Sequence, residues 1–168
     1  MSDEPNTNGK AAEPAQAPRL SIVLQYIKDI SFENPKAPAG LQSNVRPEIQ
    51  IKVDTRATQV SNDGHYEVVI DLEVEAKASE ETIFLLELDY AGVFQIANIP
   101  PDSLQPLLMI ECPRLLFPFA RRIVADMTRD GGFPPLMIDP IDFVTLYRQR
   151  LASAASQAKA GGTDTALT

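Results

Sequence analysis

The chain has 168 residues, of which 44% are hydrophobic and 23% charged, and its formal net charge is −8. This length suits one domain with a substantial core, and no apolar run approaches the roughly 20 residues that cross a bilayer. Residues 21–92 alone carry a net −7, from six basic and thirteen acidic residues. That concentration of acid argues against nucleic acid or an anionic membrane as partner and favours a basic protein.

The two ends of the chain differ from its middle. Residues 1–19 are polar, with no apolar signal core, and predict a disordered tail; residues 152–168, rich in Ala, Gly and Thr, predict another. The expected domain is therefore 20–151. Cys112 is the only cysteine, so no intrachain disulfide can form, which is typical of a reducing, cytoplasmic environment.

Period-2 alternation of apolar and polar residues predicts four strands. They lie at residues 20–32, 48–54, 65–77 and 82–90. In the first strand the even positions are apolar except Lys28. One apolar and one polar face per strand is typical of an antiparallel sheet. Asp63-Gly64 predicts a tight hairpin, whereas the stretch at 34–47, with three prolines, predicts a long crossover loop.

Helical periodicity follows after residue 100. Pro113 could occupy the first turn of a helix that runs to about Asp130, where the Gly-Gly pair at 131–132 would end it. A second helix is expected to begin with Asp139 as N-cap and Pro140 at its first position. Strands followed by helices predict an α+β fold: a four-stranded antiparallel sheet with helices packed on one face.

Residues suited to catalysis are few. His65 is the only histidine, and its place beside a turn favours a solvent-exposed side chain over a catalytic base. Cys112 precedes a helix but has no base paired with it, which favours a packed thiol. One His and one Cys cannot supply the three or four ligands of a zinc site, and nothing resembles a phosphate-binding loop. We therefore predict no enzyme activity, no metal and no cofactor.

Six long runs together cover the chain from about residue 20 to 151: QYIKDISFENPKAP (25–38), RPEIQIKVDT (46–55), YEVVIDLEV (66–74), EETIFLLELDYAGVFQIANI (80–99), CPRLLFPFAR (112–121) and GFPPLMIDPIDFVTLY (132–147). These runs resemble the SecB family of protein-export chaperones. The resemblance implies a cytoplasmic, ATP-independent chaperone that binds unfolded preproteins, keeps them competent for translocation and delivers them to the SecA ATPase. It also implies a homotetramer built as a dimer of dimers, with no cofactor, no nucleic acid and no direct membrane insertion.

The resemblance further implies a groove for unfolded polypeptide. Its residues would be Val45, Ile49, Ile51, Val53, Tyr147 and Leu151. Taken alone, the alternation of Ile49, Ile51 and Val53 favours the core face of a plain sheet, and only the resemblance makes the groove an equal alternative. The family commonly has tryptophan at the position of Val45, and this chain contains none.

Two more surfaces are implied in the same way. The docking surface for SecA would comprise Asp29, Glu33, Leu85 and Glu87, and the oligomer interface Leu86, Leu88 and Tyr90, packed under helices that meet at the centre. The pattern adds that Leu85 shares a face of its strand with Glu87 and Asp89. An apolar residue ringed by acids suits a small hot spot with a charged rim, although a single exposed leucine is also ordinary.

Two alternative functions remain open from sequence. One is a SecB-like chaperone dedicated to a toxin–antitoxin system or another single client, which nothing in the groove residues excludes. The other is an α+β domain with a closed pocket for a small ligand or an enzymatic reaction. That alternative needs polar residues converging inside the apolar layer, and Lys28 alone interrupts the inward-facing set.

Overall fold

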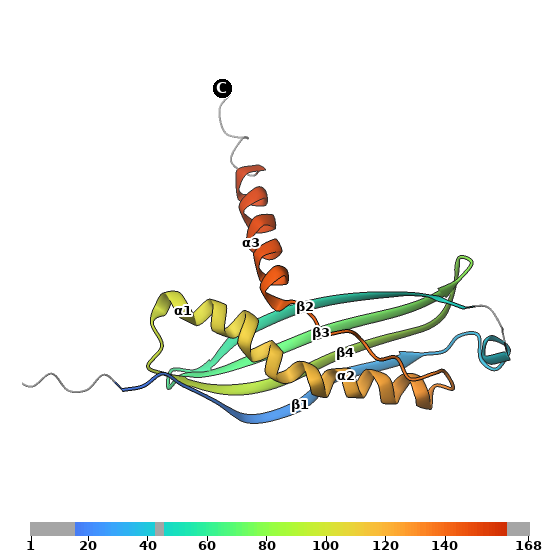
Figure 1. The fold of residues 1–168 in the computed structure, drawn as a ribbon, viewed down its shortest axis with the longest axis horizontal. Coiled ribbons are helices and arrows are strands. Elements are labelled where there is room, and N and C mark those ends of the chain that lie inside the picture. The colour runs from blue at the N-terminus through green and yellow to red at the C-terminus, as the bar shows by residue number, and fades with distance from the viewer. Residues whose placement is uncertain (1–15, 43–45, 161–168) are drawn as a thin grey trace, which may run out of the picture.

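The computed structural model describes residues 16–42 and 46–160. Its four strands form one antiparallel sheet in the order β1-β4-β3-β2 (Figure 1). The strands are β1 (Arg19–Glu33), β2 (Glu48–Ser61), β3 (His65–Ala78) and β4 (Glu81–Ala97). The predicted α+β fold is confirmed. Two strands, β2 and β4, end well beyond the alternating segments, because backbone pairing continues where apolar alternation stops.

The core lies between one face of the sheet and the helices. Even-numbered residues of the two central strands supply most of it, and they are almost completely buried: Val68, Ile70, Leu72, Val74, Leu86, Leu88 and Phe94. Each such side chain stabilises the fold by about 1.5–3 kcal/mol through burial of apolar surface. The helix above them approaches closely at Gly92, where a Cβ atom would lie 2.7 Å from Leu116.

Helical structure begins earlier than the sequence predicts. A continuous run comprises α1 (Pro101–Pro106), the π-helical turn η2 (Leu107–Glu111) and α2 (Cys112–Asp130). Pro113 lies near the start of α2 but does not begin the run, because Glu111 and Cys112 already have helical backbone angles. Pro118 lies inside α2 at an exposed position, where solvent can satisfy the carbonyl that loses its donor.

The last helix, α3 (Phe143–Ala160), corrects two expectations. Its N-cap is Asp142 rather than Asp139, because the Asp142 carboxylate accepts hydrogen bonds from the backbone N–H groups of Val144 and Thr145 at 3.0 and 3.1 Å. The helix also continues past residue 151, so residues 152–160 are helical rather than a disordered tail. Residues 161–168 lie outside the described part of the chain. Figure 1 shows α3 projecting steeply away from the sheet.

β1 does not keep one apolar face along its whole length. Its register with β4 shifts between Ile22 and Leu24 and again between Ile27 and Asp29. Each β-bulge inserts one residue and reverses which positions face the core. Tyr26 therefore lies on the face of the sheet remote from the helices. Lys28, the apparent interruption of an inward set, belongs to the second bulge and pairs with a glutamate outside the core.

Candidate functional site

A groove of about 480 Å³ opens between the start of β2, residues 40–41 and 46–47, and the loop after α2. Its lining is mainly apolar: Leu41, Pro47, Ile49, Ile83, Phe84, Phe133, Pro134, Pro135 and Leu136 with Gly40, Arg46 and Gly132. Phe84 packs against Phe133 in a tilted arrangement with ring centroids 4.9 Å apart, and it stacks on Phe32 at 5.7 Å. With Arg46 as its one ionisable lining residue, the groove can hold apolar side chains with little demand on their identity.

The loop that forms one groove wall is held by a buried threonine. Thr128 of α2 is fully buried; its backbone carbonyl accepts from the N–H of Phe133 at 3.0 Å, and its hydroxyl accepts from the N–H of Leu136 at 2.9 Å. Gly132, with φ +91°, makes the left-handed turn that starts this loop. These contacts fix the aromatic wall relative to the helix. Sequence reasoning missed Thr128, although its place before a Gly-Gly turn and a proline pair was a visible signal.

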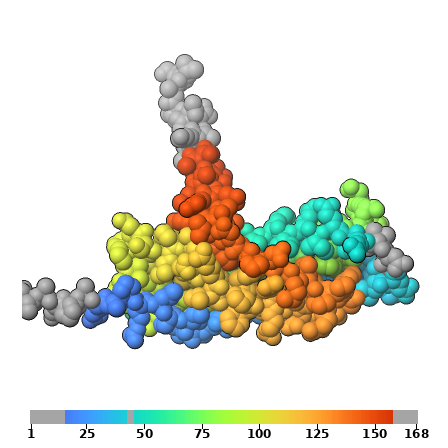
Figure 2. Space-filling model, viewed as in Figure 1, coloured from blue at the N-terminus to red at the C-terminus, as the bar shows by residue number. Residues whose placement is uncertain are grey.

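The structure separates the residues predicted to line the groove. Ile49 lines it, and Ile51 and Val53 continue from it along the same face of β2, with Ile51 40% exposed. Tyr147 and Leu151 belong to α3 and are not among the residues that line the groove. Figure 2 shows that α3 projects from the rest of the molecule. Val45 lies outside the described residues.

The residues predicted as a docking surface come together on the sheet face remote from the helices. Glu33 of β1 lies opposite Leu85 of β4, and Leu85 lies opposite Glu75 of β3. Glu87 of β4 and Asp29 of β1 lie on the same face of the sheet, in nearby residue pairs of these two strands, and both are exposed. A half-buried leucine is therefore bordered by carboxylates on two neighbouring strands.

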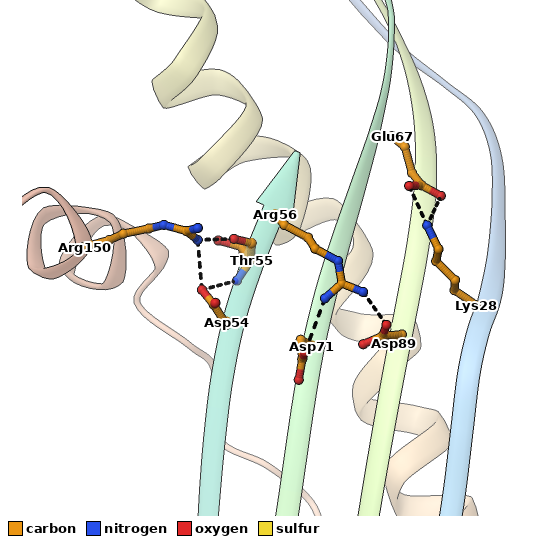
Figure 3. Close-up of polar contacts among 8 residues, drawn as sticks. All are labelled: Lys28, Asp54, Thr55, Arg56, Glu67, Asp71, Asp89 and Arg150. Carbon is orange, nitrogen blue, oxygen red and sulfur yellow. Dashed lines mark hydrogen bonds and ion pairs between the residues drawn. The ribbon is translucent and has the colours of Figure 1, made fainter. Parts of the chain in front are cut away.

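Four aspartates form a row across this face. Strand pairing aligns Asp29 with Asp89, Asp89 with Asp71 and Asp71 with Asp54. Arg56 of β2 reaches across the row, donating to Asp71 at 3.3 Å and to Asp89 (Figure 3). Burial, followed by the charge of Asp89, raises the pKa of Asp71 above its ordinary value of 3.8, and Arg56 opposes that rise. Like charges opposite one another destabilise a sheet, so Arg56 offsets this repulsion.

Replacing Arg56 tests that arrangement. We expect Arg56→Met to lower the free energy of unfolding by about 1 kcal/mol at pH 7, a value discounted for the half-exposed ion pairs. Without Arg56, every remaining influence on the pKa of Asp71 raises it. In the variant, Asp71 of the folded state then binds a proton more tightly. The loss of stability caused by the substitution should therefore be smaller at pH 5 than at pH 7. Urea unfolding at both pH values measures this difference.

The matched control for that prediction is Lys52→Met. Lys52 lies on the same strand and face and binds a single carboxylate, Glu73, at 2.7 Å, while its side chain is 71% exposed. We expect this variant to unfold at nearly the same urea concentration as the wild type, because an ion pair this exposed is screened by solvent. An equal loss in both variants, or no change with pH, would contradict the role given to Arg56.

A second polar cluster on the same face fixes the bulge of β1. Lys28 donates to Glu67 at 2.7 Å, and the Tyr26 hydroxyl donates to the same carboxylate. The bond from Lys28, followed by that from Tyr26, lowers the pKa of Glu67, while Glu67 raises the pKa of Tyr26 to about 12. The cluster explains why Tyr26 and Lys28 both lie outside the core despite the period-2 pattern.

The residues predicted for an oligomer interface are buried within the chain itself. Leu86 is 0% and Leu88 2% exposed, and Tyr90 stacks on Phe119 of α2 with ring centroids 6.4 Å apart. Leu86 and Leu88 lie beneath the helices and present almost no surface to a second copy of the chain. Six of the large exposed apolar residues form two groups: Ile22, Val23, Leu24 and Ile27 on β1, and Leu115 and Phe119 on α2.

Comparison with known proteins bears directly on this arrangement. The family model described as "Preprotein translocase subunit SecB" matches residues 13–154. The chain belongs to the SecB family. The chain is 56% identical over 153 residues to a "Protein-export protein SecB" from Afipia carboxidovorans, covering 90% of this chain and 94% of that one. A protein of the same name from Rhodopseudomonas palustris (strain BisB5) is 52% identical, covering 90% of this chain and 96% of the relative.

A solved structure shares the fold. It is the Mycobacterium tuberculosis Rv1957 SecB-like chaperone in complex with a ChAD peptide from the Rv1956 HigA1 antitoxin. The TM-score is 0.57 at 15% identity, covering 73% of this chain and 91% of that one. SecB proteins are export chaperones and not enzymes, and membership of the family assigns that role to this chain. The prediction of a non-enzymatic chaperone is thereby confirmed.

The residues that might have carried chemistry fit a SecB protein. Cys112 is buried, and burial followed by the charge of Glu111 raises the pKa of its thiol to about 12, so the reactive thiolate is disfavoured. His65 lies 2.8 Å from Asp63 in the β2–β3 turn. Within 16–42 and 46–160, no group of three or more metal-binding side chains gathers. No helix in those ranges is long and apolar enough to span a bilayer.

Proposed function

We propose that this SecB protein captures unfolded preproteins in the cytoplasm without nucleotide and delivers them to the SecA ATPase. The observation that carries this proposal is the apolar groove, which is continuous with the open edge of β2 through Ile49. Apolar walls accept many side chains, and an open strand edge can pair with the main chain of any extended segment. Together they favour non-native polypeptide over folded protein.

The acidic sheet face supports a separate role in docking to SecA. Asp29, Glu33, Leu85 and Glu87 lie on neighbouring positions of β1 and β4, remote from the groove. An apolar centre with a carboxylate rim suits an interface in which buried contact supplies affinity and charge supplies orientation. Separate surfaces would allow the chaperone to hold a client and the translocase at the same time.

Assembly as a dimer of dimers is supported by the two groups of exposed apolar side chains. One group follows the open edge of β1, where Val23 and Leu24 are 52% and 49% exposed. The other lies on the outer side of α2, where Leu115 and Phe119 are 43% and 44% exposed. Two apolar surfaces of different geometry suit two different contacts between copies, which is what a tetramer built from dimers requires.

The function is tested by adding the chaperone to a chemically unfolded protein that aggregates on dilution. We expect suppression of light scattering at a near-stoichiometric ratio, with no effect of added ATP and weak binding to the same protein once folded. A need for ATP, or equal affinity for the folded form, would overturn the proposal. Binding to one dedicated client but not to arbitrary unfolded proteins would support the single-client alternative instead.

A further inference from the structure

The open edge of β2 has a defined orientation. β2 pairs with β3 on one side, and in the part of the chain that the structure describes no strand pairs with it on the other. In an antiparallel strand the N–H and C=O of one residue point to the same side, and successive residues alternate. The β2–β3 register is regular from Glu48 to Gln59. All odd-numbered residues in that range therefore present their backbone groups to the same side of the strand.

Thr55 shows which side that is. Its carbonyl accepts a hydrogen bond from Arg150 of α3, which approaches β2 from outside the sheet (Figure 3). Its N–H donates to the carboxylate of Asp54 at 2.8 Å. Arg150 also bonds Asp54 at 2.9 Å, which closes a ring of three contacts. The odd-numbered residues of β2 thus point to the open edge, and at Thr55 both edge groups are already occupied.

This ring has the hydrogen-bond pattern of a neighbouring strand. In a hydrogen-bonded residue pair of two antiparallel strands, the residue opposite Thr55 would supply one donor and one acceptor. Here a guanidinium supplies the donor and a carboxylate the acceptor. Thr55 is only 3% exposed, so its backbone groups have little access to water and need such partners. Among the described residues, no side chain bonds the backbone groups of the other outward-facing residues in this way. These are Ile49, which lines the groove, and Ile51 and Val53, which lie between Ile49 and Thr55.

We propose that the Asp54–Arg150 pair is a stop for strand addition, which limits pairing of an unfolded polypeptide with β2 to the stretch from Ile49 to Val53. The inference rests on the proposed function. A client segment that leaves the groove at Ile49 can pair with the backbone groups of three outward-facing residues. At Thr55 those groups are already bonded, so the segment must leave the strand edge there. The pair thereby sets the register and length of the extended segment that is bound, and Arg150 acts as a specificity-determining residue.

The stop is tested first without client, by hydrogen exchange of backbone amides measured by NMR. In the free protein, Asp54→Ala should speed exchange of the Thr55 N–H by roughly fivefold, the effect of about one net hydrogen bond. Asp54→Asn retains an acceptor oxygen and should restore slow exchange. Unchanged exchange in Asp54→Ala would overturn the inference, because the carboxylate would then not occupy that group.

The second arm adds a reduced and alkylated, permanently unfolded protein. In the wild type we expect slower exchange at Ile51 and Val53, by roughly fivefold or more, and no change at Ala57. In the double variant Asp54→Ala/Arg150→Ala, slowing should extend to Thr55 and Ala57. Arg148→Ala, which removes an exposed arginine from the same helix, should keep the wild-type pattern.

The outcomes separate the two ideas. If the unfolded protein does not bind at all, the proposed function fails and this inference fails with it. If it binds, but Ala57 is slowed in the wild type or slowing does not extend in the double variant, only the stop is overturned. Circular dichroism of each variant checks folding, which these half-exposed side chains should not disturb, since Arg150 is 50% and Asp54 68% exposed.

Discussion

Glu87→Lys is expected to weaken binding to SecA by about tenfold at physiological salt, because it reverses a charge at the edge of the proposed docking surface around Leu85. Glu87 is exposed and lies opposite Ser31 of β1, close to the row that contains Leu85. Higher salt should weaken the wild type in the same direction, since the screening length is about 8 Å at physiological ionic strength. Surface plasmon resonance with immobilised SecA at several salt concentrations measures both effects.

Two companion variants make this result specific. Glu48→Lys reverses the same charge on the same face but at the far edge of the sheet, and should change the affinity for SecA little. Leu85→Ala should weaken binding by about tenfold without altering the salt dependence, because it removes apolar contact and leaves the charges in place. Loss of client capture in a well-folded Glu87→Lys variant would show that the two surfaces overlap.

Ile51→Asp is expected to reduce capture of an unfolded client by at least about tenfold, because it buries an unpaired carboxylate wherever a client covers this face of β2. Ile51 is 40% exposed, so the chaperone itself should fold normally. Gln50→Asp is the matched control: it adds the same charge at the adjacent position, which faces the opposite side of the sheet. Fluorescence titration with an unfolded protein compares the three proteins.

The expected pattern of this pair is asymmetric. Gln50→Asp should capture clients as the wild type does, and Ile51→Asp should retain binding to SecA. Equal loss of capture in both variants would indicate that net charge, rather than the groove-side face of β2, governs the interaction.

The sheet could be predicted because its signal is local. Alternation along 65–77 and 82–90 specified which residues enter the core, and Leu72, Val74, Leu86 and Leu88 are all buried. The bulges in β1 could not be predicted in this way. The apolar residues of that strand continue through both register shifts, so Tyr26 appeared to face inward. Only the pairing with β4 and the bond to Glu67 reveal that it does not.

The candidate site was predictable in part. Period 2 placed Leu85 and Glu87 on one face of their strand, whereas Asp29 and Glu33 were predicted from the resemblance to SecB alone. The groove depends instead on segments distant in sequence, residues 40–41 and 46–47 and the 132–136 loop, which no periodicity connects. The assignment of Tyr147 and Leu151 to the groove required the direction of α3. That direction depends on the Asp142 cap and on the contact between Arg150 and β2.

The strand order has a consequence for how the chain folds. β2, β3 and β4 follow one another through short connections and can pair as they are synthesised. Within residues 16–42 and 46–160, β1 pairs with β4 alone, so Arg19 cannot pair until Ala97 has been made. Closing so long a loop is the slow step expected in a topology of this kind. During synthesis the apolar stretch from Ile22 to Ile27 is therefore the first to be made and the last to gain a neighbour. Until β4 arrives, this chaperone presents the same kind of exposed segment that it binds in other proteins.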